Sequence, residues 1–130
     1  MKPFFVIVIV TLLMGCVKQN SGSDLARPSM RLTAPMIKLT SPQDYQRFSA
    51  GQIVSITATI TDNNQLQKVR LLVTRSTGAQ VLRLEKYLDV NSYKLSESFI
   101  VTAGPQYIIR IEAVDQNNNN AKTRIEVSCK

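Results

Sequence analysis

The stretch from Gln52 to Thr61 alternates apolar and polar side chains without a break. It reads QIVSITATIT, so that in an extended chain its apolar residues share one face and its serine and threonines share the other. In a helix the same apolar residues would spiral around the cylinder and form no stripe. The stretch therefore predicts a β-strand that is buried on one face and solvated on the other.

Similar runs predict further strands over residues 68–75, 80–88, 93–102, 106–115 and 123–129, with a leading strand that carries Ile37 and Leu39. Turn signals rich in Gly, Pro, Asn and Asp separate these runs, as at Asp62-Asn63-Asn64, Asp89-Val90-Asn91 and residues 117–120. Seven short strands without a helical period predict an all-β fold, an antiparallel two-sheet sandwich of about seven strands over residues 35–130. The inward side chains are expected to be Val54, Ile56, Ala58, Ile60, Val69, Leu71, Val73, Leu82, Leu84, Leu88, Tyr93, Leu95, Phe99, Val101, Tyr107, Ile109, Ile111, Ala113, Ile125 and Val127.

A frame of residues spread over this region resembles a bacterial immunoglobulin-like domain. Its members are Pro35, Ile37, Leu39, Ser41-Pro42, Phe48, Gly51, Thr61-Asp62-Asn63, Leu66, Val69, Tyr107, Ile109, Ile111, Ala113-Val114-Asp115 and Asn119. Asn118-Asn119 stands where such domains often have Gly-Asn, a mild departure because Asn tolerates the left-handed conformation. Tyr107, after the Ala103-Gly104-Pro105 corner, could be a tyrosine corner whose hydroxyl bonds back to the backbone. The resemblance implies the fold and leaves adhesion, spacing, carbohydrate contact and inhibition all open.

The first residues have the pattern of a secretory signal. A basic start at Met1-Lys2 precedes an apolar run over residues 4–14, which as a helix would measure roughly 17 Å against a hydrocarbon core about 30 Å thick. Residues 1–15 are therefore expected to be a signal peptide. Leu13-Met14-Gly15-Cys16 resembles the bacterial lipoprotein lipobox, which implies cleavage before Cys16 and attachment of diacylglycerol and a further acyl chain, such as palmitate, to Cys16. The alternative is an ordinary signal peptide followed by a chance cysteine.

The next segment, residues 16–34, combines this cysteine with Ser, Gly, Asn, Pro and scattered charge and shows no period of 2 or 3.6. This composition predicts a flexible linker between a lipid anchor and the domain. The expected location is the bacterial cell envelope. Val17 is not the Asp associated with inner-membrane retention in some bacteria, so the outer membrane is favoured over the inner one.

The residue inventory argues against catalysis. The chain contains no His and no Trp, and once Cys16 is lipidated the one remaining thiol is Cys129, so that Ser-His-Asp and Cys-His sites are impossible. No cofactor is expected. Asp62 to Asn64 and Asp115 with residues 117–120 offer oxygen ligands for a calcium ion. These two loops supply only two carboxylates, whereas calcium takes six to eight oxygen ligands, usually with several carboxylates among them. The favoured interpretation is Asx turns.

Charge suggests a partner. Without Lys2, 15 Lys and Arg stand against 9 Asp and Glu, a balance of about +6. Arg70, Arg110 and Arg124 fall on outward positions of three strands that the immunoglobulin order places side by side. This face is either a solvated sheet with cross-strand ion pairs to Glu112 and Glu126, or a surface for lipid phosphate, an anionic polysaccharide or an acidic protein. Nucleic acid is not expected, because no basic stripe has interleaved aromatic residues.

Two function classes remain. The favoured one is a membrane-anchored envelope lipoprotein whose domain is a non-catalytic protein-interaction or assembly module. The alternative is a small-ligand or carbohydrate-binding lipoprotein, which is weakened because only Tyr45 and Tyr87 among the aromatic residues of the domain are expected to be exposed. Cys129 is interpreted as a small apolar residue that ends a strand rather than as a partner in an intermolecular disulfide.

Overall fold

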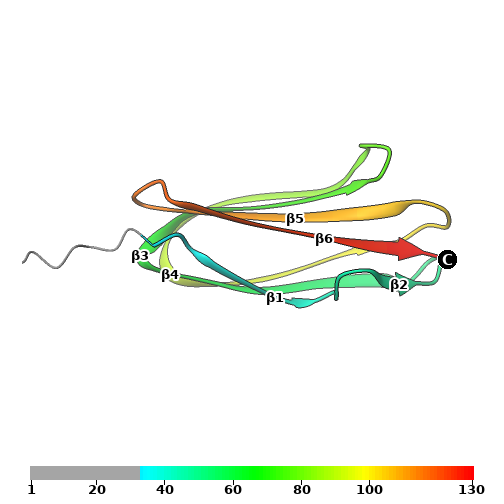
Figure 1. Ribbon diagram of the computed structural model, residues 1–130, viewed down its shortest axis with the longest axis horizontal. Coiled ribbons are helices and arrows are strands. Elements are labelled where there is room, and N and C mark those ends of the chain that lie inside the picture. Colours follow the sequence, from blue (N-terminus) through cyan, green and yellow to red (C-terminus); the bar gives the residue numbers. More distant parts are fainter. Residues whose placement is uncertain (1–32) are drawn as a thin grey trace, which may run out of the picture. The chain divides into compact units, whose positions relative to one another are not determined.

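The computed structural model describes residues 33–130 and shows a sandwich built from strands alone. Within these residues the chain forms six strands, and Figure 1 shows their order in space. They are β1 (Met36–Ser41), β2 (Gln46–Phe48), β3 (Ile53–Arg75), β4 (Gln80–Ile100), β5 (Gln106–Asp115) and β6 (Asn120–Cys129). The all-β fold expected from the alternating pattern is thus confirmed.

The six strands stack as two layers. The first layer consists of β1, residues 53–61 of β3 and residues 92–100 of β4, all antiparallel. The second layer consists of residues 80–90 of β4, residues 66–75 of β3, β5, β6 and the short β2, which runs parallel to β6. Hydrogen bonds join both layers into one folded sheet, because β3 and β4 pass from one layer to the other and bend at the same end of the domain (Figure 1).

The bends in β3 and β4 each join two of the seven expected strands into one, which leaves five, and the unpredicted β2 brings the number within residues 33–130 to six. Residues 62–64 and 89–91 were expected to be turns that end strands, yet each lies inside a long strand. Pairing slips between Thr61 and Leu66, and Gln65 adopts a positive φ of 64°. The Asn91 side chain donates to the carbonyl oxygens of Asp62 and Asn63 at 3.1 and 3.2 Å. The chain does change direction there, but these hydrogen bonds keep the two strands paired through the bend.

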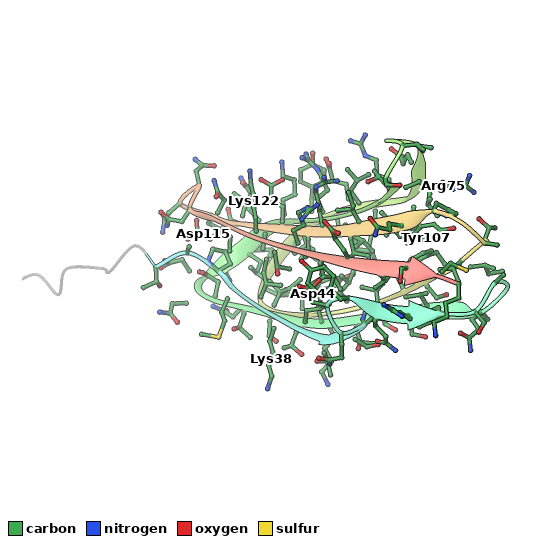
Figure 2. All side chains as sticks on the ribbon, turned by 45° about the vertical axis from the view of Figure 1, so that its right-hand side comes forward. Lys38, Asp44, Arg75, Tyr107, Asp115 and Lys122 are labelled. Carbon is green, nitrogen blue, oxygen red and sulfur yellow. The ribbon has the colours of Figure 1, made fainter. Side chains whose placement is uncertain are left out.

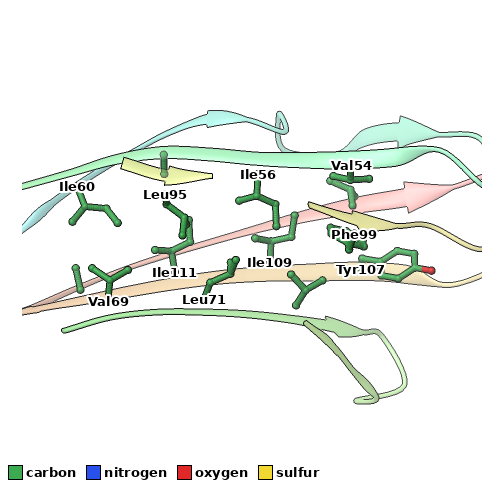
Figure 3. Packing of buried hydrophobic residues seen from close by; sticks show 14 of the residues in the cluster. Val54, Ile56, Ile60, Val69, Leu71, Leu95, Phe99, Tyr107, Ile109 and Ile111 are labelled. Atoms are coloured by element: carbon green, nitrogen blue, oxygen red, sulfur yellow. The ribbon is translucent and has the colours of Figure 1, made fainter. Parts of the chain in front are cut away.

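The space between the layers is filled by the apolar side chains that alternation placed inward. Figure 3 shows Val54, Ile56 and Ile60 of the first layer facing Leu71, Ile109 and Ile111 of the second. Almost every buried apolar residue was expected, and Leu66 is the one that lies outside the predicted alternating runs. Removing a buried isoleucine side chain down to Ala costs about 2–5 kcal/mol, so each of these residues matters to the fold.

The two stretches of β4 are less buried because each is an edge of its layer. Leu82, Leu84, Leu88 and Tyr93 are half-buried and pack against the core. Lys86 stands opposite the buried Val69, with its Nζ 5.7 Å from the ring centroid of Tyr93. Glu97 likewise stands opposite the buried Ile56. Charges at such inward positions discourage edge-to-edge pairing between molecules.

The sequence predicted two local features at the ends of β5, the tyrosine corner at Tyr107 and the left-handed conformation near Asn118. The Tyr107 hydroxyl accepts a hydrogen bond from the backbone N–H of Thr102 at 2.8 Å, so the tyrosine corner is confirmed. Asn118 has a φ of 63°, which is the left-handed conformation that Asn tolerates. The three-residue β2 was not predicted, because a strand that short carries no readable alternation.

Candidate functional site

The three arginines predicted to form a partner-binding face lie on the outward side of the second layer. Arg70 lies on β3, Arg110 on the adjacent β5 and Arg124 on the next strand, β6. Figure 2 shows Lys122, also on β6, on the outer side of this layer, where the nitrogen atoms of basic side chains gather. We call the outward side of the second layer the charged face.

Strand register divides the charged face into rows of directly opposed residues. One row, the paired row, consists of Glu85, Arg70, Glu112 and Lys122 on β4, β3, β5 and β6. The next row, the arginine row, consists of Arg83, Leu72, Arg110 and Arg124 on the same four strands. The sequence predicted three of these eight positions as a binding face, because row membership depends on register and not on alternation alone.

Opposite charges alternate along the paired row. Arg70 Nε lies 2.8 Å from Glu85 Oε2, and its Nη1 lies 3.3 Å from Glu112 Oε2. Lys122 Nζ lies 3.4 Å from Glu112 Oε1 and ends the row. These are the cross-strand ion pairs that the sequence offered as one interpretation of the face. For Arg70 that interpretation holds.

Hydrogen bonds in the paired row fix its charge. The hydrogen bond to Glu85 raises the pKa of the Arg70 guanidinium above its ordinary value. Hydrogen bonds from Arg70 and from Tyr87 lower the pKa of the Glu85 carboxyl. The hydrogen bond that Tyr87 donates to Glu85, at 3.0 Å, raises the pKa of the Tyr87 hydroxyl. Glu85 and Arg70 therefore stay ionised near neutral pH, and the row is close to electrically balanced.

The arginine row lacks this balance. Arg110 and Arg124 are directly opposite each other, a like-charge arrangement that destabilises a sheet. Arg124 pairs with Glu126 on its own strand, and Arg83 Nη2 lies 3.7 Å from Glu85 Oε2. Arg110 has no carboxylate within 4.0 Å among residues 33–130, and its Nη1 donates only to the Thr74 hydroxyl at 3.3 Å. Arg110 is thus the least compensated charge of the row.

A shallow recess of about 370 Å³ opens between the two rows. Its side-chain walls come from β3, β5 and β6, and Leu72 of the arginine row is half-buried within it. The lining residues are Arg70, Leu72, Arg110, Ile111, Glu112, Lys122, Thr123 and Arg124. The predicted arginines are therefore brought together around one hollow, which alternation alone could not show.

The carboxylate of Asp115, a candidate calcium ligand, accepts hydrogen bonds within its own loop. Asp115 is 0% exposed, and its Oδ1 accepts hydrogen bonds from the backbone N–H groups of Asn117 and Asn119, both at 2.8 Å. Its Oδ2 accepts from the Asn119 side chain at 2.8 Å. Burial would raise the pKa of the Asp115 carboxyl, but these hydrogen bonds outweigh it and lower the pKa. The carboxylate thus closes an Asx turn, as the sequence predicted.

Asp62 also makes an Asx turn, since its Oδ1 accepts from the backbone N–H of Asn64 at 2.6 Å. Its Oδ2 is buried without a hydrogen-bond partner among the residues described. In residues 33–130, no three Asp, Glu, His or Cys side chains gather closely enough to hold a metal ion. One uncommitted carboxylate oxygen falls well short of the six to eight oxygens that calcium takes.

The exposed aromatic residues do not form a sugar platform at the recess. Tyr45 and Tyr87 are 74% and 75% exposed, as the sequence predicted. Neither lines the recess between β3, β5 and β6, and Tyr45 instead borders a smaller hollow of about 150 Å³ beside β2. Carbohydrate sites combine exposed rings with a cleft, and here the ring and the cleft are separate.

Of the two cysteines, Cys129 lies within the described residues and Cys16 does not. Cys129 ends β6, is half-buried and packs against the core opposite Phe48, in agreement with the role of a small apolar residue. Cys16, the predicted lipidation site, lies outside the described residues, as do the signal peptide and most of the linker. Residues 33–130 contain no helix long and apolar enough to cross a membrane.

Comparisons with known proteins agree with this architecture. The fold is similar to fibronectin(III)-like modules of CbhA from Clostridium thermocellum, with a TM-score of 0.52 at 18% identity over 73% of this chain and 96% of that one. It is also similar to a superoxide reductase (neelaredoxin) from Ignicoccus hospitalis, with a TM-score of 0.54 at 8% identity over 75% of this chain and 80% of that one. At such low identity these likenesses show the fold alone. Among curated proteins, none matched the sequence.

A family model described as a bacterial Ig domain matches residues 35–127, which is more than half of the chain. Modules of this kind are typically non-catalytic accessory domains. The expected resemblance to bacterial immunoglobulin-like domains is confirmed for the fold, and the chain belongs to the bacterial Ig domain family.

Proposed function

We propose that this protein is a lipid-anchored lipoprotein of the bacterial envelope whose Ig domain binds another envelope protein through the charged face. The observation that carries the proposal is the arginine row, where Arg110 lies opposite Arg124 and has no carboxylate partner. A fold does not need a like-charge pair at this position, and the pair costs stability. Contact with an acidic surface would repay that cost.

The anchor completes the proposal. Leu13-Met14-Gly15-Cys16 supports acylation of Cys16, and two or more acyl chains on one residue suffice for stable attachment to a bilayer. Val17 favours the outer membrane as the destination. Attachment confines the domain to one surface, which raises its effective concentration toward other proteins there. A weak protein contact through the charged face becomes useful under that condition.

The anchor is tested by replacing Cys16 with Ser in cells. The wild-type protein should carry the mass of its acyl chains and sediment with outer membranes, whereas Cys16→Ser should lose both properties. Release of the wild-type protein from membranes by salt alone, without acyl mass, would contradict the anchor.

The binding face is tested by photo-cross-linking from one position on each outer surface. A photoreactive residue at Ile108, on the outward side of β5, should capture a protein partner in intact cells. The same residue at Thr59, on the outward side of the first layer, is the matched control and should not. Replacing Arg70, Arg110 and Arg124 together with Glu should abolish the product, with Arg110→Glu alone as the milder variant.

Equal capture from Ile108 and Thr59, or a product that survives the charge reversal at low salt, would contradict the proposed face. Capture of a polysaccharide or of lipid instead of protein would overturn the choice of partner. The alternative function, a carbohydrate-binding lipoprotein, lacks a supporting observation because Tyr45 and Tyr87 stand apart from the recess.

A further inference from the structure

We propose that the recess on the charged face is a socket for a single carboxylate, an aspartate or glutamate side chain of the partner protein. This inference rests on the proposed function and names the chemistry of the contact. The recess holds about 370 Å³ and lies where the paired row meets the arginine row. A volume of that order accommodates one side chain and part of its backbone, and is too small for a folded element.

Arg110 supplies the main anchor of the socket. A guanidinium has five N–H donors in a planar fork that matches a carboxylate. Among residues 33–130 the Arg110 fork makes one hydrogen bond, to the Thr74 hydroxyl at 3.3 Å, which is long for a charged donor. Its remaining donors are free to bind an anion on the exposed side of β5.

Arg124 supplies the second cation. It is directly opposite Arg110 and lines the same recess, and its pairing with Glu126 leaves about half of its side chain exposed. An anion between the two guanidinium groups would turn a repulsive cross-strand pair into two attractive contacts. The like-charge pair is therefore the feature that a bound carboxylate explains.

The other lining residues decide which anion fits. Among residues 33–130, Glu112 is the one carboxylate that lines the recess, beside the four cations Arg70, Arg110, Lys122 and Arg124, so a ligand there meets a net positive charge. That net positive charge attracts a dianion as well as a monoanion, so charge alone does not select between phosphate and a carboxylate. Leu72 offers an apolar floor for the methylene groups that precede a side-chain carboxylate. Together these features select a carboxylate on a short aliphatic stem.

The test uses the full lipidated chain in detergent with ¹⁵N-labelled arginines. The probes are N-acetylglutamate α-methylamide, which carries one carboxylate, and inorganic phosphate at pH 8, which is a dianion. The carboxylate should move the Nε–Hε signals of Arg110 and Arg124 together and saturate with a dissociation constant on the order of 1–10 mM, as expected of one charged group. Phosphate has no methylene groups to lie on Leu72 and should therefore bind more weakly than the carboxylate.

Matched variants separate a socket from a diffuse charge effect. Arg110→Gln should weaken carboxylate binding by about tenfold or more, since it removes the fork. Arg83→Gln removes the same charge from the same row but lies outside the recess, so binding should change by less than about twofold. Unchanged signals elsewhere in the spectrum show that each variant is folded.

Three results would overturn the inference: phosphate binding as tightly as the carboxylate, equal losses in the two variants, or no saturable shift at Arg110. If they occur while charge-dependent protein capture from Ile108 persists, the socket is wrong and the proposed function stands. If capture from Ile108 fails, the proposed function is wrong whatever the titration shows.

Discussion

The two outer faces of the sandwich have the same backbone geometry and opposite chemistry. The outward positions of the first layer carry mostly short hydroxyl side chains, which we call the hydroxyl face: Ser55, Thr57, Thr59, Thr61, Ser92, Ser96 and Ser98. Its two charges, Lys38 and Lys94, both lie opposite Thr59. The charged face of the second layer carries arginine, lysine and glutamate at the equivalent positions.

This difference separates what the fold needs from what it does not need. Threonine and serine satisfy a solvated strand position and bring no electrostatic cost. The hydroxyl face shows that an outer surface of the domain can be built with few charges. The charged face pairs most of its charges with opposite charges, whereas Arg110 has no carboxylate within 4.0 Å among residues 33–130. A binding role is the simplest reason to keep it.

Both faces cover one common core, and the largest predicted effects come from substitutions in that core. Ile56→Ala in the first layer and Ile111→Ala in the second should each destabilise the domain by about 2–5 kcal/mol, because both side chains are fully buried. Both costs, measured by urea denaturation, should fall within this range. A cost near zero for either variant would mean that the two layers do not share the core.

The next largest effect concerns the end of the second layer, where Asp115 closes the turn between β5 and β6. Asp115→Asn should destabilise the domain by about 2 kcal/mol at pH 7, because an amide cannot accept all the hydrogen bonds that the carboxylate accepts. The exposed Asp89→Asn is the matched control and should be close to neutral.

The effect of Asp115 should depend on pH in one direction. Because folding lowers the pKa of its carboxyl, the unfolded chain binds the proton more readily, and stability rises with pH. The contribution is fully present above the ordinary pKa of 3.8 and is lost as the pH falls toward the lower folded value. Urea denaturation at pH 7 and pH 3 should therefore show a smaller gap between wild type and Asp115→Asn at pH 3. A gap that widens would contradict the assignment.

The sequence predicted the parts of both faces that depend on alternation. Val54 and Tyr107 are buried, and Arg70 and Arg124 point outward, because a strand fixes the side of each residue by its parity. The course of the chain at Asp62 could not be predicted from alternation. Asp62 was expected to end a strand, since a polar turn signal is local, whereas the hydrogen bonds that carry the ladder past it come from Asn91.

The candidate site was predicted in part for the same reason. Parity places Arg110 on the outer surface but does not say which residue stands opposite it. That the neighbour is Arg124 and not Glu126 depends on the register between β5 and β6, which is set by the turn at Asp115. The recess follows from that register, so it could not be predicted from alternation alone.

The smallest effects lie within the charged face itself, where the two rows should respond in opposite ways. Arg70→Met removes ion pairs to Glu85 and Glu112 and should slightly lower the free energy of unfolding. Arg110→Met removes a charge that repels Arg124, so it should be neutral or stabilise by up to about 0.5 kcal/mol. Both values are free energies of unfolding from urea denaturation at low salt.

Salt distinguishes the electrostatic cause from a packing cause. In 1 M NaCl the Debye length shrinks to about 3 Å, so the differences between the variants and the wild type should diminish for both rows. A loss of stability in Arg110→Met that persists in high salt would mean that the stem of Arg110 packs on the sheet and stabilises it. In that case Arg110 would be explained by the fold, and the contrast between the two faces would no longer require a partner.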